Sequence, residues 1–198
     1  MRSVTPAEVL DFWFKRDRKA WFEKNPAFDA EIHSRFLPLY ELGLMGKLKT
    51  WQQQPASCLA LVILLDQFSR NMFRNSARAF AADLPAREAA GLILDNFWDK
   101  SMSPNERMFA YLPFEHSESL VDQERCLALM KEIGVFPETA DLPKWAEAHL
   151  VIIRRFGRFP HRNATLGRTN TPEEAEFLNQ PGSAMTEPAD SAKRTASD

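Results

Sequence analysis

Residues 154 to 168 hold the densest run of side chains that could bind a charged ligand. They read RRFGRFPHRNATLGR, with five arginines, one histidine and no acid. A surface that serves solubility alone mixes both signs of charge. Planar guanidinium groups form paired hydrogen bonds with carboxylates and phosphates, so we predict a site for anionic groups here. Its candidate ligand-binding residues are Arg155, Arg158, His161, Arg162 and Asn163.

The same run also has a structural interpretation. Arg154 and Arg155 fall in the last turn of a predicted helix, where cations interact favourably with the free carbonyls and the helix dipole. The guanidinium groups of the following loop could tie that loop to helix ends, or to Glu115 and Glu118. Both interpretations remain open at this point.

A second polar cluster, LDQFSRNMFR, follows an apolar segment and covers residues 65–74. If the segment is helical, Asp66, Arg70 and Arg74 lie one above another at four-residue steps. One interpretation is an ion pair between Asp66 and Arg70 that closes the helix end. The other is that a buried helix delivers Arg70, Asn71 and Arg74 into a cleft, and these three join the candidate ligand-binding residues.

The third cluster, LPFEHSE, covers residues 112–118. Pro113 is expected to end the preceding helix, which would place Glu115 and His116 on a turn. A neutral imidazole beside carboxylates could act as a general base, as a metal ligand or as a hydrogen-bonding group that positions another residue. The alternative interpretation is that these residues only cap the neighbouring helices. Glu115 and His116 are therefore the candidate catalytic residues. We expect all three clusters to converge, with a side chain of this pair within about 4 Å of an arginine from 154–168.

Other catalytic and cofactor motifs are absent from the sequence. His116, His149 and His161 together with a carboxylate have the composition of a catalytic zinc site, but no metal-binding spacing supports one, and His149 lies on an inward-facing stripe. We therefore predict no metal. There is no glycine-rich phosphate loop and no nucleophile elbow, so we predict no cofactor.

Composition and charge narrow the class of protein. Hydrophobic residues make up 44% and charged residues 26% of the 198 residues, and the net charge is -2, with a pI near 6.1. A nucleic-acid partner is unlikely because it would need a broad basic face. The longest apolar run, residues 58–65, is too short to cross a bilayer. The N-terminus lacks the layout of a signal peptide, so we expect a cytoplasmic protein with no membrane partner.

Four segments of the sequence have the features of a helix N-terminus, and these helices are expected to position the clusters. The tetrapeptides TPAE at 5–8, SPNE at 103–106 and TPEE at 171–174 each combine a hydroxyl N-cap, a proline at the first helical position and a glutamate at the third. Asn25 and Pro26 form a fourth start with the cap and the proline alone. Three full matches to one pattern strongly favour a helical protein.

Hydrophobic periodicity extends these starts to about eight helices. The helices are expected at 6–14, 26–43 with a kink or break at Pro38, 55–68, 77–98 with a possible split at Pro85, 104–111, 120–134, 145–157 and 172–179. The segment 55–65 is apolar on every side, which places it in the middle of the molecule. No strand pattern appears. We predict one all-α domain over residues 1–180, and a flexible tail over 181–198, which lacks aromatic residues.

Three strings carry a family resemblance: LLDQFSRNMFR, YLPFEHSES and RFGRFPHRNATLGR, together with VLDFWF near the N-terminus. They resemble the bacterial domain-of-unknown-function family 924, from about Val9 to Ser183. The resemblance implies an all-α fold of the tetratricopeptide-like superfamily, with antiparallel helical hairpins in a right-handed array. It implies no activity and no catalytic residue. Ser69 stands where proline is common in that family.

Two functions follow as hypotheses. The first is a tetratricopeptide-like binding protein whose concave face takes a small anionic molecule or an acidic peptide on its arginines and histidine. The alternative is a hydrolase or transferase in which Glu115 or His116 acts as general base, with arginines holding the substrate and stabilising negative charge. A narrow, deep pocket would favour the enzyme, and a long open groove would favour a peptide.

Overall fold

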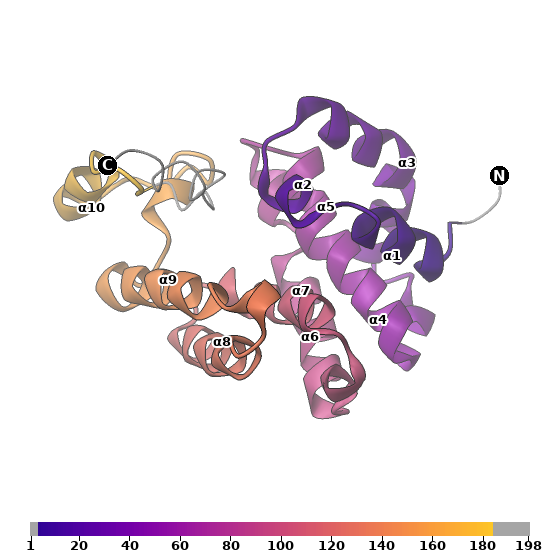
Figure 1. The fold of residues 1–198 in the computed structure, drawn as a ribbon. Coiled ribbons are helices and arrows are strands. Elements are labelled where there is room, and N and C mark those ends of the chain that lie inside the picture. Colours follow the sequence, from indigo (N-terminus) through magenta and orange to yellow (C-terminus); the bar gives the residue numbers. More distant parts are fainter. Residues whose placement is uncertain (1–3, 184–198) are drawn as a thin grey trace, which may run out of the picture.

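The structure is a computed structural model that describes residues 4–183, and these residues form helices and no strand (Figure 1). The α-helices are α1 (Pro6–Phe14), α2 (Arg18–Phe22), α3 (Pro26–Leu44), α4 (Pro55–Val62), α5 (Phe68–Met72), α6 (Asp83–Asp95), α7 (Pro104–Glu115), α8 (Leu120–Ile133), α9 (Leu142–Phe156) and α10 (Pro172–Leu178). Short 3-10 turns lie at Lys49–Gln53, Ala77–Phe80, Trp98–Ser101, Pro137–Thr139 and Pro160–Arg162. The all-α prediction is confirmed.

The predicted helix starts lie where the sequence places them. Thr5, Ser103 and Thr171 each form a complete capping box with the glutamate three residues later. Asn25 caps α3 by accepting hydrogen bonds from the backbone N–H groups of residues 27 and 28. Each cap satisfies backbone donors that a helix start leaves without partners, so these four sites fix where the helices begin.

The N-cap Ser103 allows a direct test of how much these caps stabilise the protein. Ser103→Ala is expected to lower the free energy of unfolding by about 1 kcal/mol, because the start of α7 loses its hydroxyl acceptor. Urea unfolding measures the change. Ser34→Ala is the matched control, because Ser34 lies within α3 and its hydroxyl bonds only to the carbonyl of Glu31. Equal losses in the two variants would contradict the capping explanation.

The central helix contains a π-helical turn, η2 (Ile63–Gln67), between α4 and α5. The backbone N–H of Phe68 bonds to the carbonyl of Ile63, five residues back. All five residues of the turn are buried, as are most residues of α4, which confirms that this segment runs through the middle of the molecule. A π turn holds one residue more than an α turn and is frequent at functional sites. The turn leads directly into Arg70 and Asn71.

Proline ends neither of two helices, although the sequence predicts a kink or break at Pro38 and an end at Pro113. α3 continues through Pro38, and α7 continues through Pro113 to Glu115. An interior proline costs about 3 kcal/mol, but α7 buries every side chain from Met108 to Glu115, and this packing outweighs the cost. Glu115 is therefore the last residue of α7 and not part of a turn, whereas His116, the cap of α7, lies on the turn that the sequence predicts. Pro85 falls in the first turn of α6, where a missing N–H costs little.

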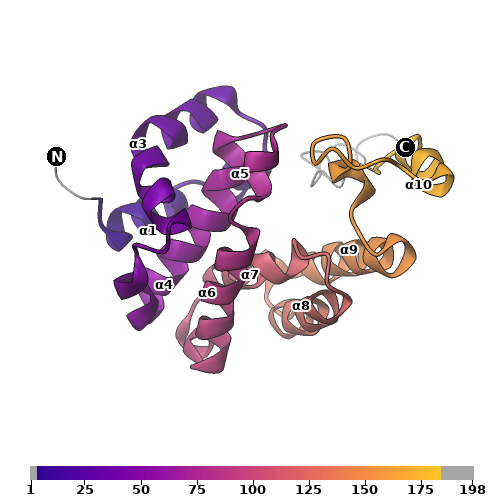
Figure 2. The same ribbon diagram turned by 180° about the vertical axis from the view of Figure 1, so that it is seen from behind.

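Helices α6 to α9 pack in sequence order, and α8 and α9 lie side by side in both views (Figures 1 and 2). The main core spans α1 to α9, with an aromatic group formed by Phe12, Trp13, Phe36, Phe68 and Phe109. The right-handed array of the tetratricopeptide-like superfamily stays a prediction. None of the helices formed by residues 4–183 combines the length and apolar character needed to cross a membrane.

The segment from Gly157 to Ser183 carries α10 (Figure 1), and Arg162 joins it to Asp83 of α6 and to the carbonyl of His116 at the end of α7. Gly157 ends α9 with a φ of 69°, a left-handed conformation that glycine adopts without strain. The segment has its own small apolar cluster, in which Phe159 is fully buried beside Ile152 and Ile153. From residue 184 on, the predicted tail lies outside the described residues.

Candidate functional site

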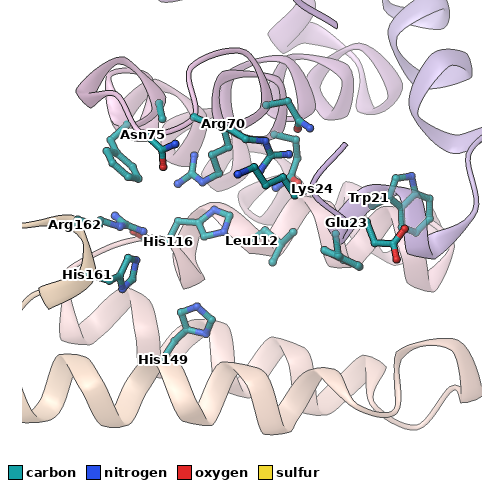
Figure 3. A pocket seen from close by; sticks show the side chains of 16 residues that line it. Trp21, Glu23, Lys24, Arg70, Asn75, Leu112, His116, His149, His161 and Arg162 are labelled. Atoms are coloured by element: carbon teal, nitrogen blue, oxygen red, sulfur yellow. The ribbon is translucent and has the colours of Figure 1, made fainter. Parts of the chain in front are cut away.

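A cavity of about 700 Å³ lies where the three polar clusters meet (Figure 3). Its volume is in the range of pockets that hold small molecules. It is lined by Trp21, Phe22, Glu23, Lys24, Gln67, Arg70, Asn71, Arg74, Asn75, Ala79, Phe80, Leu112, His116, His149, His161 and Arg162. Residues from all three clusters share this cavity, so one site collects segments that are up to about a hundred residues apart.

The cavity has two ends of different character. His161 and Arg162 lie at one end and Trp21, Glu23 and Lys24 at the other, with His116 and Leu112 between them (Figure 3). The first end comes from the loop after α9, and the second from α2 and the loop that follows it. The arrangement suits an elongated molecule with a polar head and a less polar body.

Arg70 joins the buried central helix to α6. Its Nη1 donates to the carbonyl of Asp66 at 2.9 Å and lies 3.2 Å from the Asp66 carboxylate. Its Nη2 lies 3.0 Å from Oδ1 of Asp83, at the distance of an ion pair but without the alignment of a hydrogen bond. The predicted Asp66–Arg70 ion pair is confirmed. It does not close the helix against solvent, however, because Arg70 also lines the cavity.

Asp66 is fully buried and ionised. Its carboxylate accepts a hydrogen bond from Gln67 Nε2 at 2.7 Å and faces His116 Nδ1 at 2.8 Å. Burial alone would raise the pKa of Asp66, but the Arg70 guanidinium and His116 outweigh it and hold the pKa well below its usual range. An ionised carboxylate can only accept hydrogen bonds, so His116 Nδ1 carries the proton.

His116 presents its other ring nitrogen to the cavity. Burial, followed by the nearby Arg70 guanidinium, lowers the pKa of His116, so the ring is neutral near pH 7. With the proton on Nδ1, the Nε2 atom has a free lone pair. Nε2 has no hydrogen-bond partner among residues 4–183, and His116 lines the cavity. The group is therefore a base or an acceptor that is open to a ligand.

Arg162 is the most buried cation of the cavity, with 6% of its surface exposed. Its Nη1 donates to the main-chain carbonyl of His116 at 3.0 Å and lies 3.6 Å from Asp83 Oδ2. The guanidinium carbon lies over the ring of Phe80, 4.7 Å from its centroid, and over the ring of Phe159, 4.4 Å from its centroid. The arginine-rich run and the segment 112–118 therefore meet at the main-chain carbonyl of His116. The contact predicted from the sequence is different, because it involves a side chain of Glu115 or His116.

The charge of Arg162 is incompletely compensated. Burial, followed by repulsion from Arg70, lowers the pKa of Arg162 to about 10. Asp83 is its only ion-pair partner in the described part of the chain, and Arg70 shares that partner. Its buried Nε has no hydrogen-bond acceptor among these residues. Arg162 lines the cavity, so its weakly paired positive charge faces a ligand bound there.

Asn71 and Arg74 line the cavity but are tied to α3. Asn71 Nδ2 donates to Asp29 Oδ1 at 2.8 Å, and Arg74 Nη2 donates to the same oxygen at 3.0 Å. Arg74 does not extend the Asp66–Arg70 stack, because α5 ends at Met72. The Asp29 carboxylate neutralises Arg74, which leaves Arg70 and Arg162 as the main donors for a ligand.

Glu115, the other candidate catalytic residue, lies behind the cavity wall. It is 3% exposed, and burial raises its pKa to about 7. Its Oε1 lies 3.4 Å from His149 Nδ1, and its Oε2 is 3.9 Å from Cys126 Sγ. Glu115 does not line the cavity, so direct action on a ligand there stays a prediction without support from its position.

His149 and His161 both line the cavity as neutral rings. His149 Nδ1 donates to the carbonyl of Trp145 at 2.9 Å, and burial lowers the pKa of each histidine to about 4. His149 is therefore more than the core histidine that its helical stripe indicates. Among residues 4–183, no three histidine, cysteine or carboxylate side chains gather in a way that would hold a metal ion.

The other residues of the arginine-rich run serve structure. Arg158 forms two hydrogen bonds with the Glu174 carboxylate, and Arg155 bonds to Glu173, both glutamates lying in the first turn of α10. Asn163 is fully buried and donates to Asn170. Arg155, Arg158 and Asn163 do not line the cavity. Their role as ligand-binding residues stays a prediction without support from their positions, because Glu173, Glu174 and Asn170 already bind them.

Arg168 supports the structural interpretation most directly. It forms a bidentate ion pair with Glu118, in which Nη1 donates to Oε2 at 2.7 Å and Nη2 donates to Oε1 at 2.9 Å. Glu118 also accepts a hydrogen bond from the backbone N–H of Phe159. This glutamate was one of the two acids expected to tie the loop. The contact fixes the loop that carries His161 and Arg162 against the start of the α8 region, so these two side chains reach the cavity from a held position.

Several cavity residues escape prediction from sequence. Trp21 and Lys24 come from α2 and its following loop, and no helix is expected there from periodicity alone. The Asp17 N-cap of α2 is the signal that could have indicated it. Phe80 reads as a core residue of a long helix, but it lies in a 3-10 turn beside the two arginines. Asp83 has no distinguishing motif, and its partners are far apart in sequence.

The fold and this cavity define the class as an all-helical protein with a buried arginine–histidine site. The chain matches the profile of a family described as a bacterial protein of unknown function, DUF924, over residues 9–182. The chain belongs to this family, as the three sequence strings indicate. It is also similar to a solved structure of a protein of unknown function from Agrobacterium tumefaciens, with 39% identity and a TM-score of 0.82, covering 88% of this chain and 96% of that one. No curated protein shows significant similarity.

Proposed function

We propose that this protein binds a small molecule through a carboxylate or similar anionic group at the arginine–histidine end of the cavity. The observation that carries the proposal is Arg162, which lines the cavity, is only 6% exposed and has one ion-pair partner among the described residues, Asp83 at 3.6 Å, which it shares with Arg70. A ligand carboxylate would supply a second negative partner for this guanidinium. Arg70, which also lines the cavity, adds a second positive charge.

The charges of the site favour a singly charged head group. Asp66 pairs with Arg70, both arginines share Asp83, and the three histidines of the cavity are neutral, so the weakly paired charge of Arg162 is the one left to compensate. A carboxylate head group supplies one negative charge, whereas a phosphate supplies up to two. The proposal therefore places carboxylates ahead of phosphate and sulfate as ligands.

A small molecule fits the cavity better than an acidic peptide does. Its volume of about 700 Å³ is in the range of pockets that hold drug-sized ligands, with Trp21 at one end and His161 and Arg162 at the other (Figure 3). The acidic peptide of the first hypothesis is thus the less favoured partner. A cytoplasmic location and the absence of nucleic-acid binding stay predictions.

A thermal shift assay with succinate tests the proposal. A ligand that binds only the folded state at a hundredfold excess over its Kd stabilises it by about 2.7 kcal/mol, which corresponds to roughly 5–10 °C for a chain of this size. We expect such a shift for the wild-type protein and its loss in Arg162→Gln, because the head group loses its buried cation.

Two further variants control this experiment. Arg154→Gln is expected to retain the full shift, because Arg154 is half exposed, lies outside the cavity and pairs with Glu124. Arg158→Gln is also expected to retain it, although the variant loses its contacts to Glu174. A shift that persists in Arg162→Gln, or its absence from the wild-type protein, would argue against the proposed site.

A further inference from the structure

The Asp66–His116 pair is built as an acid–base unit. Asp66 holds the His116 ring at Nδ1, at 2.8 Å, and Arg162 holds the main chain of the same residue by donating to its carbonyl at 3.0 Å. The backbone N–H of His116 also bonds to the carbonyl of Leu112 at 2.9 Å. A base that is fixed in this way needs little reorganisation when it takes up a proton.

Asp66 has the features of an orienting carboxylate. It is fully buried, and Gln67 and Arg70 bind it independently of His116. These contacts keep the carboxylate ionised and fix the protonated nitrogen of the imidazole, so that Nε2 alone is free to accept a proton. An ionised Asp66 also stabilises the imidazolium that forms after proton transfer.

The same cavity supplies positive charge for a developing negative charge. Arg70 lines the cavity together with His116, and Asp66 and Asp83 hold its guanidinium in place. A preorganised positive charge of this kind stabilises the oxyanion of a tetrahedral intermediate. Arg162 and His161 lie beyond His116 at one end, and Leu112 and Trp21 lie on its other side (Figure 3).

We propose that this protein hydrolyses small carboxylic esters whose acyl part carries a free carboxylate, with Asp66 and His116 as its acid–base pair. The inference rests on the proposed function, because the free carboxylate is the group that Arg162 binds. The ester carbonyl then lies beside His116 and Arg70, and the alcohol part extends along Leu112 toward Trp21.

The reaction needs only water as its second reactant. His116 Nε2 takes a proton from a water molecule, whose oxygen forms a bond to the carbonyl carbon while the carbonyl oxygen becomes negative beside Arg70. The intermediate then breaks the bond to the alcohol oxygen, which takes the proton from the His116 imidazolium. The products are a dicarboxylate and an alcohol, and the proton of the new acid passes to solvent.

Hydrolysis of two nitrophenyl esters tests the inference. Mono(4-nitrophenyl) succinate carries the free carboxylate, and 4-nitrophenyl acetate lacks it. We expect kcat/KM for the succinate ester to exceed that for the acetate ester by at least tenfold. In His116→Gln we expect a fall of about 10²–10⁴-fold, the usual contribution of a general base. His33→Gln, at an exposed site outside the cavity, is expected to match the wild-type protein.

The pH profile separates catalysis from a structural role. Activity requires neutral His116, so kcat/KM should fall with decreasing pH, with an apparent pKa below that of an ordinary histidine. Diethyl pyrocarbonate provides a measurement on the wild-type chain, independent of whether the variant folds. It should modify His116 and abolish hydrolysis in parallel, and succinate should slow both.

The outcomes distinguish the two proposals. A thermal shift with succinate, combined with no hydrolysis of either ester above the buffer rate, would overturn catalysis and leave binding intact. The absence of any shift would remove the proposed binding function and the inference with it. Hydrolysis that is equal in the wild-type protein and in folded His116→Gln would also overturn the assignment of the base.

Discussion

Asp66→Ala is expected to lower the free energy of unfolding by about 3–5 kcal/mol, the usual cost of removing one partner from a buried ion pair. Asp66 is fully buried and is contacted by Gln67, Arg70 and His116. The substitution leaves the charge of Arg70 with Asp83 alone, at a distance of 3.0 Å. Urea unfolding at pH 7 measures the effect.

The matched control is an exposed aspartate in a similar ion pair. Asp11 pairs with Lys15 four residues later, and both side chains are largely exposed. Exposed pairs contribute about 0–1 kcal/mol, so Asp11→Ala should change stability little. A loss below 1 kcal/mol for Asp66→Ala would mean that the buried network relaxes or takes up water, and the preorganised acid–base pair would lose its physical basis.

Glu115→Gln is expected to stabilise the protein by about 3 kcal/mol at pH 8 and to have little effect at pH 4. Burial raises the pKa of Glu115 from 4.5 to about 7, and each pKa unit corresponds to about 1.4 kcal/mol. A raised pKa in the folded state gives stability that is complete below pH 4.5 and is lost as the pH rises to 7. Glutamine stays neutral and avoids this loss.

The measurement is the difference in unfolding free energy between the variant and the wild-type protein across pH 4–8. The difference is needed because His149 and His161 titrate in an overlapping range. Their pKa values are lowered to about 4, so their contribution is lost as pH falls from 6.5. Glu147→Gln, at an exposed site of α9, serves as control. A difference that is independent of pH would show that Glu115 ionises freely.

Local signals in the sequence predict most of the fold. The capping boxes at Thr5, Ser103 and Thr171 are local chemistry, and all three form. The errors arise where tertiary packing overrides a local preference. Pro113 stays within α7 because the helix is buried along its whole second half. The five-residue helix α2 is too short for a periodic pattern to reveal it.

The sequence predicts which clusters form the candidate site, but it does not predict which acid pairs with which arginine. Arg70, His116, His161 and Arg162 come together as expected. Which arginine is free depends on acids elsewhere, and ion pairs between distant residues leave no mark in the sequence. Arg158 and Arg162 look alike in RFPHR. One meets Glu174, which α10 presents, and the other stays buried with an unpartnered Nε.

The π-helical turn Ile63–Gln67 determines which way the arginine of the central helix faces. A regular α-helix advances about 100° per residue, so one additional residue within a turn rotates everything after it by roughly that angle. The additional residue in the turn thus sets which side of α5 faces the cavity relative to the buried face of α4. The number of residues between Val62 and Phe68 is thus a determinant of the site in its own right. Insertions and deletions at this point matter as much as the identity of any side chain that they would displace.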